Sequence, residues 1–152
     1  MHAHWIEDDE PIGAEQLVAQ GLTYQQMATD PEAHRTPLEA LMAAHGYVNR
    51  DQVALSPETP NLEAICAKFW DEHHHTEDEV RFVLEGEGIF DIRSLDDRWM
   101  RVTVVPGDLL IVPKDRNHRF KLSVNQSIRC VRLFKDPAGW QAVYRTDAAQ
   151  GS

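Results

Sequence analysis

Cysteine is scarce in this chain of 152 residues, which contains only Cys66 and Cys130. Each lies in an apolar segment. The two could form one disulfide, but two buried thiols in a reducing compartment are the simpler interpretation. A dense disulfide framework of the kind found in small secreted domains is excluded, and we expect a cytoplasmic protein.

Long hydrophobic runs and clusters of basic residues are also absent. The apolar stretches are too short to cross a bilayer, and the acidic segment 1–10 lacks the apolar core of a signal peptide. The 15 Lys and Arg residues are scattered and outnumbered by 25 Asp and Glu residues, which gives a net charge of −10 with His neutral. Such a chain repels phosphate groups, so we expect neither nucleic acid nor a membrane as a partner.

No internal repeat, low-complexity tract or linker divides the chain. Its length suffices for one hydrophobic core, so we expect a single domain over residues 1–152. Helix signals dominate residues 1–70 and strand signals dominate residues 71–146. Nothing in the pattern demands an oligomer, and we expect a monomer.

Two helices are indicated before residue 70. Residues 36–39, Thr-Pro-Leu-Glu, have the form of a capping box with proline at the first helical position, and Gly46 stands where that helix would end. Leu38 and Leu41 fall on one face, so the helix should cover an apolar surface. Asn61 is placed to cap a second helix over residues 62–69.

Short strands separated by turns follow. Residues 80–85 and 89–93 flank the sequence Gly-Glu-Gly at 86–88, which predicts a hairpin. Further strands are indicated at residues 99–105, 109–113, 119–124, 128–134 and 140–145. Strands at this spacing without intervening helices favour a mainly β antiparallel barrel or sandwich, with the helical part packed on its outside.

The run from 72 to 82 carries chemistry at a spacing that suits a metal ion. Alternate side chains of an extended strand share a face, so His73 and His75 point the same way. Glu79 and Arg81 keep that parity if no bulge intervenes. His118 offers a third imidazole in strand-like surroundings. Three imidazoles and one carboxylate favour an octahedral iron- or nickel-type site with open positions.

Two alternatives accompany this assignment. His74 faces away from its neighbours, and a shifted register that uses His74 with Asp78 would supply one imidazole instead of two. Arg81 could also form a structural ion pair with Glu77 or Glu79.

Other polar residues near these positions have competing interpretations. Glu72 is either a partner that orients a ligand imidazole or a surface carboxylate. His2 and His4 repeat the His-x-His spacing, but on a terminus that we expect to be frayed, and we assign them no metal.

The spacing of these residues resembles the two motifs of the cupin superfamily, whose fold is a double-stranded β-helix, a jelly-roll-like antiparallel barrel. The first motif is matched by His73, His75, Glu79 and Gly86, and the second by Gly107, Pro113 and His118. The chain departs from the motifs at Ala67, Asp115 and Leu122, where they have two glycines and an asparagine. These departures concern loop shape more than ligands.

A closer resemblance, to the acireductone dioxygenase family of methionine salvage, covers most of the chain. The matching segments are residues 69–82, 86–93, 99–101, 107–108, 118–120, 132–134 and Trp140, with looser matches at 22–24 and 45–47. The resemblance implies that His73, His75, Glu79 and His118 bind the metal. It also implies that Arg81 lies beside the substrate and that Phe69 and Phe120 are aromatic residues near the pocket.

The resemblance implies an activity as well. The family cleaves 1,2-dihydroxy-3-keto-5-methylthiopentene with O2. Iron(II) gives 4-methylthio-2-oxobutanoate and formate, and nickel(II) gives methylthiopropionate, formate and carbon monoxide. The same ligands serve both metals, and we favour iron(II). The alternatives are another metal cupin, a dioxygenase or isomerase of a different small molecule, and a non-catalytic metal-dependent sensor or binding module.

Overall fold

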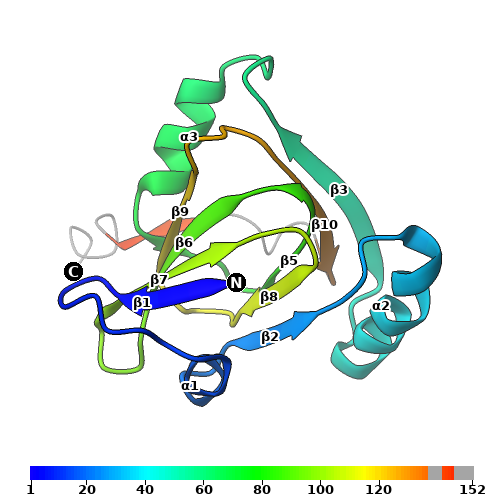
Figure 1. Cartoon of the computed structure of the whole chain (residues 1–152), viewed down its shortest axis with the longest axis horizontal. Helices are drawn as coiled ribbons and strands as arrows, with labels where there is room; N and C mark the ends of the chain where they lie inside the picture. The colour runs from blue at the N-terminus through cyan, green and yellow to red at the C-terminus, as the bar shows by residue number, and fades with distance from the viewer. Residues whose placement is uncertain (137–141, 146–152) are drawn as a thin grey trace.

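Two antiparallel sheets and three helices make up the described part of this computed structural model, residues 1–136 and 142–145 (Figure 1). The first sheet has the order β1 (His2–Trp5), β7 (Trp99–Val104), β6 (Gly88–Arg93), β9 (His118–Leu122), β4 (His73–His74), β11 (Val143–Tyr144). The second has the order β2 (Thr23–Gln26), β8 (Asp108–Val112), β5 (Glu79–Gly86), β10 (Ile128–Phe134), β3 (Asn49–Leu55). The helices are α1 (Ala14–Ala19), α2 (Pro31–His45) and α3 (Leu62–Trp70).

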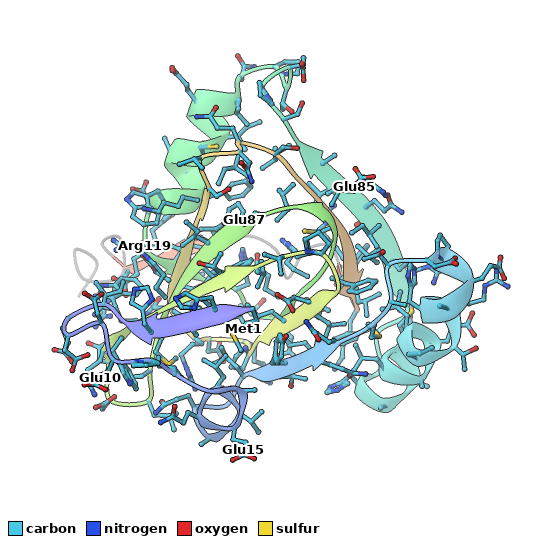
Figure 2. The ribbon with its side chains drawn as sticks, viewed as in Figure 1. Met1, Glu10, Glu15, Glu85, Glu87 and Arg119 are labelled. Carbon is cyan, nitrogen blue, oxygen red and sulfur yellow. The ribbon has the colours of Figure 1, made fainter. Side chains whose placement is uncertain are left out.

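The alternation of side chains along the second sheet produces two apolar clusters. On β10, Ile128 and Cys130 face the first sheet and join a cluster that fills the space between the sheets. Val131 and Leu133 point the other way and pack with Leu38 of α2, which covers the outer face. This is the apolar surface that the predicted helix was expected to cover. Charged side chains such as Glu10 and Glu15 lie at the periphery (Figure 2).

The predicted start of α2 was wrong, whereas its predicted end was right. The helix begins at Pro31 behind Asp30, whose carboxylate accepts a hydrogen bond from the backbone N–H of Glu32 at 3.0 Å. Pro37 therefore lies inside the helix, where it lacks an N–H to donate. At the other end Gly46 has φ +76°, a left-handed conformation that glycine adopts without strain.

The predicted second helix is present as α3, but its predicted cap is not. Asn61 precedes the helix in a left-handed conformation and its side chain makes no capping hydrogen bond. The apolar positions along residues 62–69 were therefore the reliable signal, and the cap residue was not.

The prediction that residues 1–70 are a helical part packed on the outside missed three strands. β1 pairs with β7, β2 with β8 and β3 with β10, so the N-terminal part extends both sheets. All three are edge strands. An edge strand bonds to a single neighbour and can be short and polar, which is why β2, Thr-Tyr-Gln-Gln, carries little strand signal. Figure 1 shows β1 and β2 along one side of the fold.

The predicted hairpin across residues 86–88 was also wrong, although both of its strands exist. β5 pairs with β8 and β10, whereas β6 pairs with β7 and β9, so the chain crosses from one sheet to the other at this point. The crossing places β5 on the sheet opposite β4 and β9. Residues on β5 can therefore meet residues on β4 and β9 in the interior.

The last predicted strand, residues 140–145, falls partly outside the described residues. Val143–Tyr144 forms β11 and pairs with β4, while Trp140 is not among the described residues. Among those that are described, no helix is long and apolar enough to span a membrane.

Candidate metal centre

Three buried histidines converge in the space between the sheets. His73 on β4 is paired in register with His118 on β9, and His75 follows in the loop that leads to β5. Ligand atoms of all three imidazoles lie within 4.8 Å of one another. Their exposed fractions are 4%, 2% and 9% for His73, His118 and His75. The geometry is that of a site able to hold one ion.

Backbone carbonyl groups determine the tautomers of two of these histidines. Nδ1 of His73 lies 2.6 Å from the carbonyl oxygen of Asp71, and Nδ1 of His118 lies 2.9 Å from that of Arg116. A carbonyl oxygen only accepts, so each Nδ1 must carry a proton and donate it. In the neutral ring Nε2 then holds the lone pair that metal coordination requires.

Glu79 completes the cluster from the opposite sheet. Its Oε2 lies 2.9 Å from Nε2 of His118, yet neither atom has a partner with hydrogen-bond geometry. Its Oε1 lies 3.7 Å from Nε2 of His75 and accepts a hydrogen bond from Arg81 at 2.9 Å. Two buried lone-pair atoms that face each other are costly unless a proton or a cation lies between them. The donor set therefore fits a divalent metal ion.

The pKa shifts of Glu79 and His73 favour the protonation states that bind a metal ion. Burial disfavours a charged Glu79, but the guanidinium of Arg81, followed by His118 and His75, holds the pKa of Glu79 well below its usual value. Burial, and then His118, lowers the pKa of His73. Burial also lowers the pKa of His118, but the charge of Glu79 outweighs it and raises that pKa. At neutral pH Glu79 is thus a carboxylate and His73 a neutral imidazole, the states that bind metals.

A cavity of about 240 Å³ opens beside the cluster. Phe69 from α3 and Phe120 from β9 form one wall, with ring centroids 6.0 Å apart and nearly perpendicular planes. Phe90 continues that wall 4.8 Å from Phe120. Val53 and Ile128 contribute further apolar surface to the cavity. The cavity therefore has a polar end at the histidines and apolar walls.

Comparison with known proteins places this site in a family. The model of the ARD/ARD' family matches residues 3–142. The chain belongs to the ARD/ARD' family. Acireductone dioxygenase of Heterostelium pallidum is 39% identical over 145 residues, covering 95% of this chain and 98% of that protein. Acireductone dioxygenase of Dictyostelium discoideum is 40% identical over 146 residues, covering 95% and 99%.

A solved structure of the family has the same fold. Acireductone dioxygenase from Bacillus anthracis, with a cadmium ion in its active centre, superposes with a TM-score of 0.89 at 28% identity. The match covers 94% of this chain and 97% of that one. It confirms the predicted mainly β cupin fold, and the family match confirms the resemblance drawn from the sequence.

The predicted metal ligands and the predicted substrate residues all line one cavity. It is lined by His73, His75, Glu79, His118, Arg81, Phe69 and Phe120. Sequence reasoning missed Lys68, Cys130, Arg132 and Tyr144, which line it as well. The alternation of side chains along β10 could have placed Cys130 and Arg132 on one face, but whether that face lines the cavity depends on how the strands pair. Val53 also lines the cavity, and it was missed because its strand, β3, was not predicted.

His74 and Asp78, the alternative pair in the run 72–82, have other contacts. Nδ1 of His74 lies 3.3 Å from the side-chain oxygen of Asn117, and His74 does not line the cavity. Asp78 accepts hydrogen bonds from the Tyr47 hydroxyl at 2.8 Å and from the backbone N–H of Lys114 at 2.9 Å. A register that uses His74 and Asp78 therefore does not occur.

Two further carboxylates of the run, Glu77 and Glu72, form structural hydrogen bonds outside the histidine cluster. Glu77 accepts hydrogen bonds from backbone N–H groups after β10, so the partner of Arg81 is Glu79. Glu72 accepts from Arg93 and Arg145, so it does not orient a ligand imidazole. Backbone carbonyl groups do that for His73 and His118.

The N-terminal histidines lie in ordered structure. His2 and His4 are on β1, which pairs with β7, so the expectation of a frayed terminus was wrong. Their ring centroids are 5.9 Å apart, and His4 approaches Asp9 at 3.7 Å.

Proposed function

We propose that this protein is a metal-dependent acireductone dioxygenase that cleaves 1,2-dihydroxy-3-keto-5-methylthiopentene with O2. The observation that carries the proposal is the convergence of three imidazoles on a buried carboxylate at the end of an apolar cavity. The named relatives are acireductone dioxygenases and match nearly the whole chain. An open metal site beside an arginine suits an enediolate substrate better than it suits a binding module without turnover.

We assign His73, His75, Glu79 and His118 as the ligands of one metal ion. When bound, the ion supplies Lewis-acid activation of the substrate oxygens. Imidazole and carboxylate donors accept iron(II) and nickel(II) alike. We take iron(II) as the ordinary metal, with 4-methylthio-2-oxobutanoate and formate as products. Nickel(II) is the alternative, with methylthiopropionate, formate and carbon monoxide as products.

Arg81 positions the charged part of the substrate. Its Nη1 donates to the carbonyl oxygen of Val80 and its Nη2 to Glu79, each at 2.9 Å, so the guanidinium is held beside the cluster. A divalent ion with one carboxylate leaves one positive charge, and a dianionic enediolate would reverse the sign. Arg81, which is always protonated, offsets that excess and can donate to a substrate oxygen throughout the reaction.

The apolar walls accommodate the methylthioethyl tail. Phe69 and Phe120 offer ring faces and edges to an alkyl thioether and keep bulk water from the reacting end. The thiol of Cys130 also lines the cavity, and burial raises its pKa to about 11, so it stays neutral. Phe69, Phe120 and the thiol of Cys130 therefore offer the tail an uncharged surface that excludes water.

We propose further that the protein acts as a cytoplasmic monomer with a small molecule and O2 as its partners. Cys66, which is half-buried, and Cys130, which is buried, are both free thiols, and that state suits a reducing compartment. Size-exclusion chromatography with light scattering would test the monomer, since a mass near twice 17.4 kDa would contradict it.

The test of function is anaerobic reconstitution with iron(II) or nickel(II), followed by acireductone and O2. Loss of the enediolate absorbance with formate release is expected for both metals, and carbon monoxide for nickel alone. His75→Gln should lose metal and activity, whereas the matched control His74→Gln should keep both. A rate no faster than spontaneous oxidation would refute the proposal, and retained metal without O2 uptake would favour a non-catalytic module.

A further inference from the structure

Three cationic side chains line the cavity of this acidic protein. Lys68, Arg81 and Arg132 contribute three positive charges to its walls. Among the described residues that line it, Glu79 is the one carboxylate. The chain as a whole has a net charge of −10. The cavity therefore stands out as a positive region within a negative molecule.

The cations form a path of decreasing exposure. Lys68 on α3 is exposed, and the side chain of Arg132 on β10 is 23% exposed. The side chain of Arg81 is 17% exposed, and Glu79 at the metal cluster is 10% exposed. Arg132 and Arg81 lie directly opposite each other across β10 and β5. The path thus runs from solvent at Lys68 to the reacting end at Arg81.

Arg132 is held in place by a carboxylate outside the cavity lining. Its Nε and Nη2 donate to the two oxygens of Asp51 on β3 at 2.8 and 2.6 Å. This two-point contact fixes the guanidinium and offsets part of its charge. The side chain of Lys68, by contrast, forms no ion pair or hydrogen bond within residues 1–136 and 142–145, so its ammonium group can follow an approaching ligand.

We propose that Lys68 and Arg132 form a cationic entrance that draws the anionic substrate into the cavity and delivers it to Arg81. An anion approaching a protein of this net charge is repelled at long range. Local cations at the mouth of a cavity with low-dielectric walls focus the field and reverse that repulsion near the site. The inference rests on the proposed function, because it takes the enediolate as the anion.

The first experiment measures kcat/KM for acireductone at about 0.01 M and about 1 M salt, where screening lengths are about 30 Å and 3 Å. Lys68→Gln should lower kcat/KM about threefold to tenfold at low salt, leave kcat unchanged and weaken the salt dependence. Lys68→Arg should restore the wild-type value. Arg50→Gln is the matched control: it removes the same charge from the side of β3 that faces α2, where Arg50 pairs with Leu133 in register.

The second experiment separates this inference from the proposed function. Calorimetric titration of the nickel(II)-loaded protein with oxalate, a small dianion, reports anion capture without turnover. Lys68→Gln should weaken oxalate binding at low salt, and Arg50→Gln should not. Weaker binding in a protein that fails to turn over acireductone would support the entrance while refuting the function. Equal oxalate affinities for wild type and Lys68→Gln, or equal losses in Lys68→Gln and Arg50→Gln, would overturn the inference.

Discussion

Gly86 and Gly88 lie at the crossing between the two sheets, and we predict different consequences when each is replaced by alanine. A Cβ on Gly86 would lie 2.1 Å from the carbonyl oxygen of Ser127, and this glycine has φ +79°. A Cβ on Gly88 would lie 2.6 Å from Cε2 of Phe120 and 2.9 Å from Cδ1 of Ile128. The first substitution meets backbone, whereas the second meets the ends of two side chains that line the cavity.

The magnitudes follow from these contacts. Gly86→Ala combines a left-handed backbone cost of about 1–2 kcal/mol with a clash that only backbone movement relieves, so we expect a loss of about 3 kcal/mol or more. In a chain of this length that lowers Tm by about 10 °C. Gly88→Ala should cost about 1–3 kcal/mol, because rotation of Phe120 and Ile128 relieves part of the overlap. It should also raise KM for the substrate, because Phe120 contacts the tail, while metal content stays at the wild-type level.

Scanning calorimetry, metal analysis and steady-state kinetics on both variants test this contrast. Wild-type stability for Gly86→Ala would show that Gly86 does not have a left-handed backbone beside the carbonyl oxygen of Ser127. An unchanged KM for Gly88→Ala, with Phe120 displaced, would refute the assignment of that wall to the substrate.

Three further outcomes are expected. Arg81→Lys keeps the charge but loses the planar donor pair, so kcat/KM should fall about 10²-fold with metal content unchanged. Asp91 is fully buried and accepts a hydrogen bond from Arg119, which is labelled in Figure 2. Because Asp91→Asn removes the carboxylate from this ion pair, it should lower the free energy of unfolding, measured in urea, by about 3–5 kcal/mol. Burial, followed by the hydrogen bond to Asp78, raises the pKa of Tyr47. The stability that Tyr47 contributes to the fold is therefore complete below a pH of about 10 and is lost above it. Tyr47→Phe should reduce the alkaline loss of stability.

Each of these has a clear contrary result. Equal kcat/KM for Arg81→Lys would remove Arg81 from substrate positioning. A loss below about 1 kcal/mol for Asp91→Asn would mean that its ion pairs are not buried in solution. An identical alkaline unfolding profile for Tyr47→Phe would assign the pH dependence to other groups.

The candidate site could be predicted because its signals are local. The period of two along a strand places His73 and His75 on one face, and this needs no knowledge of neighbouring strands. His118 was joined to them through the second motif and not through geometry. The pairing of β4 with β9, which explains the contact, is visible only in the structure.

The parts that could not be predicted depend on contacts distant in sequence. The glycine pair at 86–88 is typical of a hairpin, but at the crossing the backbone N–H of Glu87 donates to the carbonyl oxygen of Ser127, far along the chain. β2 is polar because it is an edge strand, a property of the assembled sheet. Lys68 and Arg132 lie far apart in the sequence, on a helix and a strand, and both line the cavity. A sequence pattern specifies faces, and tertiary packing decides which faces meet.

The most direct test of the central claim is anomalous diffraction from crystals of the nickel(II)-loaded protein. The claim predicts one strong peak per chain within bonding distance of imidazole nitrogens of His73, His75 and His118 and of the carboxylate of Glu79. A peak at His74, or an ion that lacks His118 or Glu79 as a ligand, would contradict it.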